Sequence, residues 1–402
     1  MAQPINIEDF DKYIRQGEPD KKEKAYIWQT AIGLQDVDGL KTSDYLRETA
    51  RRNIEGEISA DEVSQLIKSY YLSKTQREPD DDEKEEADQA ASNINKILSA
   101  RTLNFSTQGY ISLHRRIFEG VFKHAGKIRD YDITKKEWVL NGDTVNYLNN
   151  EDLRRALNYD IEQERQFSYK GLSTDEMIAH ITRFVSGLWQ IHAFGEGNTR
   201  TTAVFTIQYL RSIGFDITND LFAKHSWYFR NALVRANYKN ARLGIDYTPI
   251  YLERFFRNLL LGEKNELRNR YMLVNPPEGL AAPASTPSST PASTPSSASV
   301  PFTTDNENIL RLVKAIGHRQ LSVNEMLAAV GLKDRMNFME YSLTPAMAEG
   351  FVCLLYPDKP RHPRQKYLLT VKGSALYNEL TKVLSPASGS CCCADGSYVY
   401  RR

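Results

Sequence analysis

The residues best suited to chemistry in this 402-residue chain lie within ten consecutive positions, 191–200, which read Ile-His-Ala-Phe-Gly-Glu-Gly-Asn-Thr-Arg. His192 titrates near neutral pH and can serve as a general base. Glu196 offers a carboxylate oxygen, a ligand that Mg²⁺ takes together with substrate phosphates. Arg200 can form a two-pronged contact with phosphate oxygens, and the Asn198 amide can donate to the same group. The stretch predicts an enzyme that acts on a nucleotide.

Two helices must hold this stretch in place. Apolar residues recur at three- and four-residue steps before it, which predicts a helix that ends near residue 191. A similar stripe runs from Thr201 to Gly214, and Gly214 is a suitable C-cap. Residues 195–199 then form a tight turn that leads into the second helix.

This turn is expected to attract an anion. The first amide groups of a helix have no partner within it, and the helix dipole favours negative charge there. Gly195 and Gly197 allow the backbone to approach a phosphate closely, while Phe194 is expected to anchor the turn in the core. The alternative is that His192 is an ordinary core histidine and the glycines form a plain turn. Short glycine motifs do match by accident, but the whole combination favours a site.

The same residues resemble the signature of the Fic family in the Fido superfamily, which reads His-x-Phe-x-(Asp/Glu)-Gly-Asn-Gly-Arg-x-x-Arg. The matching residues are His192, Phe194, Glu196, Gly197, Asn198 and Arg200. Two positions differ, because Thr199 replaces a glycine and Ala203 replaces the final arginine. The resemblance implies a mainly α fold, with an all-α core and a small β-hairpin flap. It also implies a protein adenylyltransferase, which moves AMP from ATP to a hydroxyl of a target protein.

The resemblance further assigns roles to the residues. It implies that His192 is the general base and that Glu196 holds Mg²⁺. The nucleotide would be bound by Gly195, Glu196, Gly197, Asn198, Thr199 and Arg200. Mg²⁺ is the implied cofactor, ATP the co-substrate, and an unidentified protein the partner. In the family the final arginine of the signature orients the γ-phosphate, and this chain has Ala203 there.

Other segments extend the resemblance over roughly residues 105–265. Residues 113–130 resemble the early core helix of the family and the turn after it. Residues 131–147 contain Asn141-Gly142, a strong hairpin signal, and resemble the flap that holds an extended target segment; the alternative is a plain surface hairpin. Residues 226–237 resemble the helix that contacts the adenine base. Its candidates are Tyr228, Phe229 and Asn237, for which core packing is the alternative.

The N-terminal region resembles the family's inhibitory motif, (Ser/Thr)-x-x-x-Glu-(Gly/Asn). Glu55 and Gly56 match it, whereas Arg51 takes the place of the Ser/Thr. Helices are expected over residues 45–53 and 61–72, and Ser59 and Glu62 form a capping box. In the family the inhibitory glutamate pairs with the final signature arginine, which is absent here. Glu55 is therefore expected to restrain the site through Arg200 or by like charge, or else to be a solvated helix end.

Composition and low-complexity segments suggest the domain organisation. Residues 1–100 are a helical region with the inhibitory helix, 101–273 the Fic core, 274–301 a linker rich in Pro, Ser and Thr, 302–385 a winged-helix domain, and 386–402 a tail. The net charge of +1 gives no general attraction to nucleic acid or membranes. The four cysteines form no disulfide or zinc pattern, and no apolar run or signal peptide is evident. A cytoplasmic protein is expected.

The C-terminal domain has the helix and strand order of a winged helix. Helices are expected over residues 306–316, from the capping box Ser322–Glu325 to Gly331, and over 337–349, followed by strands at 351–356 and 365–370. This order resembles the winged helix at the C-terminus of many bacterial Fic proteins. The tip would carry four basic residues suited to phosphate contact: Lys359, Arg361, Arg364 and Lys366. The third helix offers few base-reading donors, so both DNA binding and protein contact remain open.

Two functions follow. The first is the AMP transferase, restrained by its own N-terminal helix. The second is a regulator that binds DNA or a partner protein through the winged helix, with a weakly active, nucleotide-sensing Fic core. The shortage of base-reading residues in the third helix of the winged-helix domain favours the transferase. The departures from the signature at Thr199 and Ala203 favour the regulator.

Overall fold

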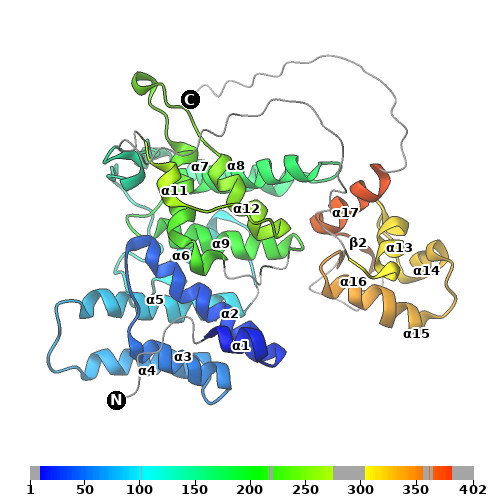
Figure 1. Cartoon of the computed structure of the whole chain (residues 1–402), viewed down its shortest axis with the longest axis horizontal. Coiled ribbons are helices and arrows are strands. Elements are labelled where there is room, and N and C mark those ends of the chain that lie inside the picture. Colours follow the sequence, from blue (N-terminus) through cyan, green and yellow to red (C-terminus); the bar gives the residue numbers. More distant parts are fainter. Residues whose placement is uncertain are drawn as a thin grey trace. The chain divides into compact units, whose positions relative to one another are not determined.

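The computed structural model describes residues 10–100, 102–215, 217, 221–274, 304–355, 362 and 365–382. They divide into two compact units (Figure 1). The first contains the described residues up to Val274 except Lys170–Ser173. The second contains those from Thr304 onward together with Lys170–Ser173. Apart from Val274, the predicted linker lies outside the described residues, as do the tail and the basic residues Lys359, Arg361 and Arg364.

The first unit is built of helices, as the mainly α fold class predicts. They are α1 (Asp11–Gln16), α2 (Pro19–Gly33), α3 (Asp44–Glu55), α4 (Ala60–Ser73), α5 (Asp81–Ser99), α6 (Thr107–Ile117), α7 (Leu153–Gln166), α8 (Thr174–Ile191), α9 (Asn198–Ser212), α10 (Leu221–Lys224), α11 (Ser226–Asn237) and α12 (Ile250–Leu261). Short 3₁₀ segments join some of them: η2 (Leu34–Asp38), η3 (Trp138–Leu140), η4 (Asn150–Asp152), η5 (Ala241–Leu243) and η6 (Asn269–Met272).

The N-terminal helices form a layer around α5. Helices α2 and α4 both pack on α5, and α3 packs on α2 and α4 (Figure 1). The carboxylate of Asp88 ties this layer together. It accepts hydrogen bonds from the backbone N–H of Ser43 at 2.9 Å and from the Tyr71 hydroxyl at 2.8 Å. Burial raises the pKa of Asp88 to about 6. The helices predicted at 45–53 and 61–72, and the capping box of Ser59 with Glu62, are confirmed.

Helix α9 is the central element of the first unit. Every residue from Asn198 to Leu210 is buried, because α5, α6, α8 and η2 all pack against this helix. Two of its threonines are satisfied within the helix, since the hydroxyl of Thr201 donates to the Gly197 carbonyl and that of Thr206 to the Thr202 carbonyl. An apolar stripe alone would not have predicted a helix enclosed all round.

The predicted β-hairpin flap is not a β-hairpin in the described residues. Its turn forms, because Asn141 and Gly142 have φ angles of 55° and 87° and the Asp143 N–H donates to the Leu140 carbonyl at 3.2 Å. The flanking residues form no strands, and η3 precedes the turn. Val139 and Leu140 are both buried, so the burial does not alternate as a half-exposed strand requires. We call residues 131–149 the cover segment.

The second unit has the predicted order of elements. Its helical segments are α13 (Glu307–Ile316), α14 (Val323–Val330), α15 (Arg335–Phe338), the π-helical η7 (Met339–Leu343), α16 (Thr344–Ala348) and α17 (Val371–Lys382). Strands β1 (Val352–Leu354) and β2 (Tyr367–Leu369) pair antiparallel, with Cys353 opposite Leu368. The capping box of Ser322 with Glu325 is also confirmed. The winged-helix interpretation of this unit stays a prediction.

Candidate active site

The loop between α8 and α9, residues 192–197, is the candidate site and is called the His192 loop. Its ends adopt left-handed backbone conformations, with φ of 50° at His192 and 70° at Gly197. Helix α9 begins at Asn198, three residues before the predicted start, because Gly197 acts as its N-cap and accepts from the Thr201 N–H at 3.0 Å. No side chain caps this helix start, so its first amides remain available to an anion.

Asn198 holds the His192 loop closed. Its Oδ1 accepts from the Phe194 N–H at 3.0 Å, and its Nδ2 donates to the Phe194 carbonyl at 2.7 Å. The side chain is 3% exposed. The Asn198 side-chain amide thus bonds to the loop backbone, whereas the sequence predicted that it would bind a phosphate.

His114 supports the loop from α6. Its Nδ1 accepts from the Gly126 N–H at 2.8 Å, so the ring proton lies on Nε2, which donates to the Glu196 carbonyl at 3.1 Å. The imidazole also stacks on Phe194, with ring centres 3.8 Å apart. Complete burial lowers the pKa of His114 to about 4, which keeps this pattern intact at neutral pH.

His192 is enclosed rather than exposed in a cleft. Its side chain is 3% exposed, and neither Nδ1 nor Nε2 has a hydrogen-bond partner. Burial lowers the pKa of His192 well below its usual value, and the charges of Lys135 and Arg129 add to this effect. The imidazole is therefore neutral at physiological pH and has two unsatisfied nitrogens, an arrangement typical of a base that awaits its substrate.

Arg129 connects the cover segment to the His192 loop. Its Nε donates to the His192 carbonyl at 2.8 Å, and its other nitrogens donate to the carbonyls of Tyr131 and Leu148. Three carbonyls thus fix one buried guanidinium. The sequence reasoning missed Arg129, since a lone arginine after a glycine turn carries no spacing signal.

Gly197 is required by its surroundings as well as by its φ angle. A Cβ atom added there would lie 2.3 Å from the Phe118 ring. At Gly195, an added Cβ would meet the Tyr131 hydroxyl at 2.6 Å. Both glycines therefore permit the close approach of neighbouring aromatic rings to the loop.

Arg200 is held by acidic residues of the N-terminal layer. Its Nε lies 2.8 Å from the Asp38 carboxylate, and its Nη2 donates to Glu86 at 2.7 Å. Its Nη1 donates to Gln35 at 2.9 Å, and the Phe118 ring centre lies 4.7 Å from the guanidinium carbon. We call these contacts the Arg200 network. The guanidinium is 1% exposed and its charge is balanced within the protein, so no donor phosphate contacts it in this conformation.

Comparison with known proteins identifies the chain. Residues 104–210 match the model of the Fic/DOC family, and residues 307–370 match that of the C-terminal domain of "Filamentation induced by cAMP protein Fic-like" proteins. The chain is a Fic family protein. No curated protein matches it. It is similar to the crystal structure of a Fic family protein from Desulfovibrio desulfuricans G20, with 14% identity over 92% of this chain and 98% of that chain, and a TM-score of 0.41.

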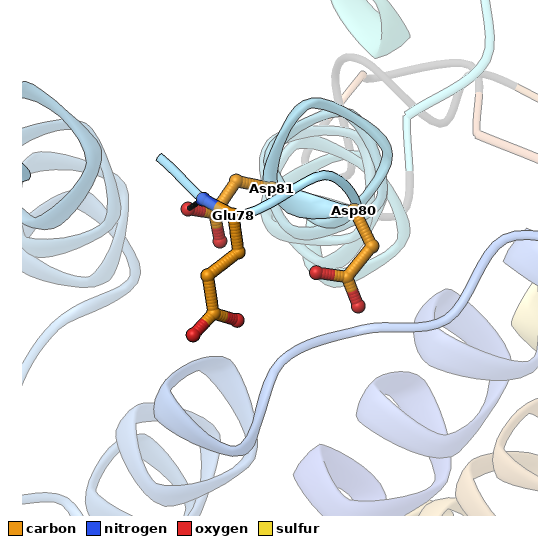
Figure 2. Close-up of side chains that lie close together, drawn as sticks. All are labelled: Glu78, Asp80 and Asp81. Carbon is orange, nitrogen blue, oxygen red and sulfur yellow. Dashed lines mark hydrogen bonds between the residues drawn. The ribbon is translucent and has the colours of Figure 1, made fainter. Parts of the chain in front are cut away.

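The Fic signature residue predicted to bind Mg²⁺ has a suitable position. Glu196 is exposed, and it lies one residue before the N-cap of α9. A single carboxylate is enough when substrate phosphates complete the shell, so this residue fits a Mg²⁺–nucleotide complex. Among the described residues, the acids close enough together to hold a metal ion by themselves are Glu78, Asp80 and Asp81 at the start of α5 (Figure 2). There Asp81 pairs with Lys74 at 2.6 Å and does not serve the signature loop.

The residues expected to contact adenine lie in the core of the Fic unit. Tyr228 is 1% exposed and donates to the Tyr251 carbonyl, while Phe229 packs among the rings of Phe222, Phe255 and Phe256. The amide of Asn237 donates to the carbonyls of Ser186 and Leu233. These contacts give all three residues a packing role in this conformation.

Glu55 lies at the end of α3, and none of its described contacts reaches the His192 loop. Its carboxylate accepts from the Tyr13 hydroxyl at 2.6 Å and from Lys21 Nζ at 2.7 Å. Arg51, in the Ser/Thr position of the motif, pairs with Glu48. The acids that do reach the signature arginine are Asp38 and Glu86, which the sequence motif does not include.

None of the helices in the described residues is long and apolar enough to cross a membrane.

His114 predicts a pH dependence of stability. Its pKa is about 4 in the folded protein and about 6.5 when unfolded. Between these values the unfolded state binds the proton, so the free energy of unfolding falls as pH falls, by ~3 kcal/mol in total. His114→Gln should remove this contribution, and the wild-type minus variant difference in urea-unfolding free energy should decrease from pH 7 to pH 4. A pH-independent difference would contradict the assignment.

The Arg200 network predicts a large loss of stability on truncation. Arg200→Ala leaves two carboxylates without their buried partner, and we expect the free energy of unfolding to fall by ~3 kcal/mol. Arg155→Ala is the control, because its partner Asp152 forms a surface pair that is highly exposed on the arginine side; the change there should stay within about 0.5 kcal/mol. Similar small losses in both variants, measured by urea unfolding, would show that the network contributes little.

Proposed function

We propose that this Fic protein transfers AMP from ATP to a hydroxyl group of a target protein, with His192 as the base. One observation carries the proposal: a buried, neutral histidine with two unpartnered nitrogens begins the short loop that leads into a helix start without a side-chain cap. A base beside an anion site is what nucleotidyl transfer requires. Membership of the Fic family supports a related transfer in general terms.

The chemistry assigned to the chain's own residues is as follows. A neutral His192 takes the proton of the target hydroxyl as its oxygen forms a bond with the α-phosphorus of ATP. The bond from that phosphorus to the bridging oxygen breaks, and pyrophosphate leaves with the electron pair. The first amides of α9 hold the negative charge that develops. Mg²⁺ on Glu196 would supply positive charge to the donor phosphates. Those phosphates would also raise the pKa of His192, which makes it a stronger base when substrate is bound.

The proposal includes self-restraint through the Arg200 network. Asp38 and Glu86 occupy the guanidinium that the signature assigns to phosphate, and their charges repel a nucleotide. Ala203, buried within α9, offers no second cation. We therefore assign the inhibition of nucleotide binding to η2 and α5. The sequence motif had indicated Glu55 for this role.

A second function is favoured by the same features. If the Arg200 network never opens, the Fic unit would sense a ligand with little turnover, and the second unit would carry the function by binding DNA or a protein. Met336 on α15 and Tyr341 on the adjoining η7 are 79% and 55% exposed. Exposed apolar side chains at that position favour protein contact over DNA.

Labelling with α-³²P-ATP tests the transfer. Wild-type protein with Mg²⁺ and a bacterial lysate should transfer label to protein, whereas γ-labelled ATP should give no label that depends on His192, because pyrophosphate leaves. His192→Ala should reduce the rate by ~10²- to 10⁴-fold, which is the usual contribution of a general base. His318→Ala, in the second unit, is the control and should label as wild type does. Equal labelling by His192→Ala, or none by wild type either on itself or on lysate proteins, would discard AMP transfer from ATP.

A double variant tests the restraint. Asp38→Asn with Glu86→Gln removes two negative charges while it keeps hydrogen-bond acceptors for Arg200. We expect ATP to bind about tenfold more tightly by calorimetry, equivalent to ~1.4 kcal/mol, and the labelling rate to rise. Glu55→Gly should match wild type, because Glu55 pairs with Lys21 and Tyr13. The opposite pattern, with Glu55→Gly activated and the double variant unchanged, would return the restraint to Glu55.

A further inference from the structure

Two aromatic rings enclose the imidazole of His192, the candidate base. The Tyr147 ring, from the cover segment, lies over the imidazole of His192 with centres 4.1 Å apart and planes tilted by 35°. Trp189, one turn earlier on α8, meets the same imidazole edge-on at 5.4 Å. Tyr147 and Trp189 also contact each other, with centres 5.7 Å apart. The orientation of His192 thus depends on two neighbouring rings.

Tyr147 is itself fixed by a chain of polar contacts. Its hydroxyl donates to Glu137 at 3.1 Å, and that buried carboxylate pairs with Arg230 of α11 at 2.9 Å. Burial raises the pKa of Glu137, and the nearby Arg230 opposes this rise. The buried Glu137 carboxylate holds the Tyr147 ring in one place. If either of its contacts, with Arg230 or with the Tyr147 hydroxyl, were lost, a buried polar group would be left without a partner.

Trp189 is fixed by a residue that departs from the Fic signature. Its indole Nε1 donates to the Thr199 hydroxyl at 3.0 Å, and both residues are buried. The signature glycine at this position has no side chain with which to accept this bond. Thr199 therefore has a specific partner in this chain, and that partner packs against the imidazole.

A general base is usually oriented by a hydrogen bond to its second ring nitrogen. His192 has no such bond, although its ring is almost completely buried. We propose that Tyr147 and Trp189 are the positioning residues for His192, each fixed by its own hydrogen bond, Tyr147 to Glu137 and Trp189 to Thr199. The two rings hold the imidazole in place and exclude water from it, while both nitrogens stay free for the reacting hydroxyl.

The charged groups around His192 allow the effect of moving Tyr147 or Trp189 on the pKa of His192 to be predicted. Lys135 of the cover segment, Arg129 before it and Arg230 of α11 all act on the imidazole and disfavour its protonation. Glu137 is the carboxylate behind Tyr147. If either ring moves, water enters and the desolvation that lowers the pKa of His192 weakens. The pKa of His192 then rises toward its ordinary value.

Two conservative variants test the two rings separately. Tyr147→Phe keeps the ring but removes its bond to Glu137, and Thr199→Val keeps the volume but removes the acceptor for Trp189. NMR titration of the full-length protein with isotope-labelled histidine should place the His192 midpoint at least one pH unit higher in each variant. His192→Gln assigns the signal. Tyr238→Phe is the matched control, because Tyr238 bonds Asp143 of the same segment but does not contact the imidazole; it should leave the midpoint unchanged.

Activity gives a second readout, which rests on the proposed AMP transfer. Both variants should lower kcat about tenfold. Tyr147→Phe should leave the KM for ATP unchanged, since the Tyr147 ring acts on the base and not on the phosphates. Raised midpoints in a protein without transferase activity would discard the proposed function but support the positioning role. An unmoved midpoint in both folded variants, judged by thermal melting, would overturn the positioning role whatever the activity. If one variant unfolds, the other decides.

Discussion

The buried guanidinium of Arg200 is the interaction on which the rest of the first unit depends. It lies on the central helix α9 and joins residues of η2 and α5, with the Phe118 ring against its face. A buried cation is strongly destabilising without partners. The ion pairs of Arg200 therefore hold η2 and α5 against α9 in addition to the apolar packing. The N-terminal layer and the signature helix are thus one structural body, and a change in that layer reaches the site directly.

A small number of residues fixes the conformation of the His192 loop. Two left-handed backbone positions set its path, Asn198 closes it, and His114 and Arg129 each hold one of its carbonyls. Such strained positions persist when surrounding contacts determine them fully, and they gather at functional sites. Within this loop both nitrogens of the His192 imidazole remain without a hydrogen-bond partner.

The two departures from the family signature have different consequences. Thr199 gains a partner in Trp189 and becomes part of the enclosure around His192. Ala203 is buried and leaves the helix without a second cation, while Arg200 is neutralised by acids. In the proposed AMP transfer His192 would be the base, and the phosphate contacts would come from backbone amides, from Mg²⁺ on Glu196, or from Arg200 after Asp38 and Glu86 move away. In the proposed transfer, the position of the base and the binding of the nucleotide donor thus depend on different residues.

The sequence by itself predicted several of the helices and the loop that carries the candidate site. Apolar spacing and cap residues predicted α8 and both capping boxes, because these signals are local and short-range, and the family resemblance predicted α11. The signature predicted that a turn would place His192 beside a helix start. Tertiary structure decided which side chains satisfy one another. Asp38 and Glu86 lie far from Arg200 in the chain, Glu137 lies far from Arg230, and the strands expected beside Asn141-Gly142 gave way to consecutive burial of Val139 and Leu140. Such pairings arise when a packed core removes polar groups from water and each must find a partner, which no local pattern records.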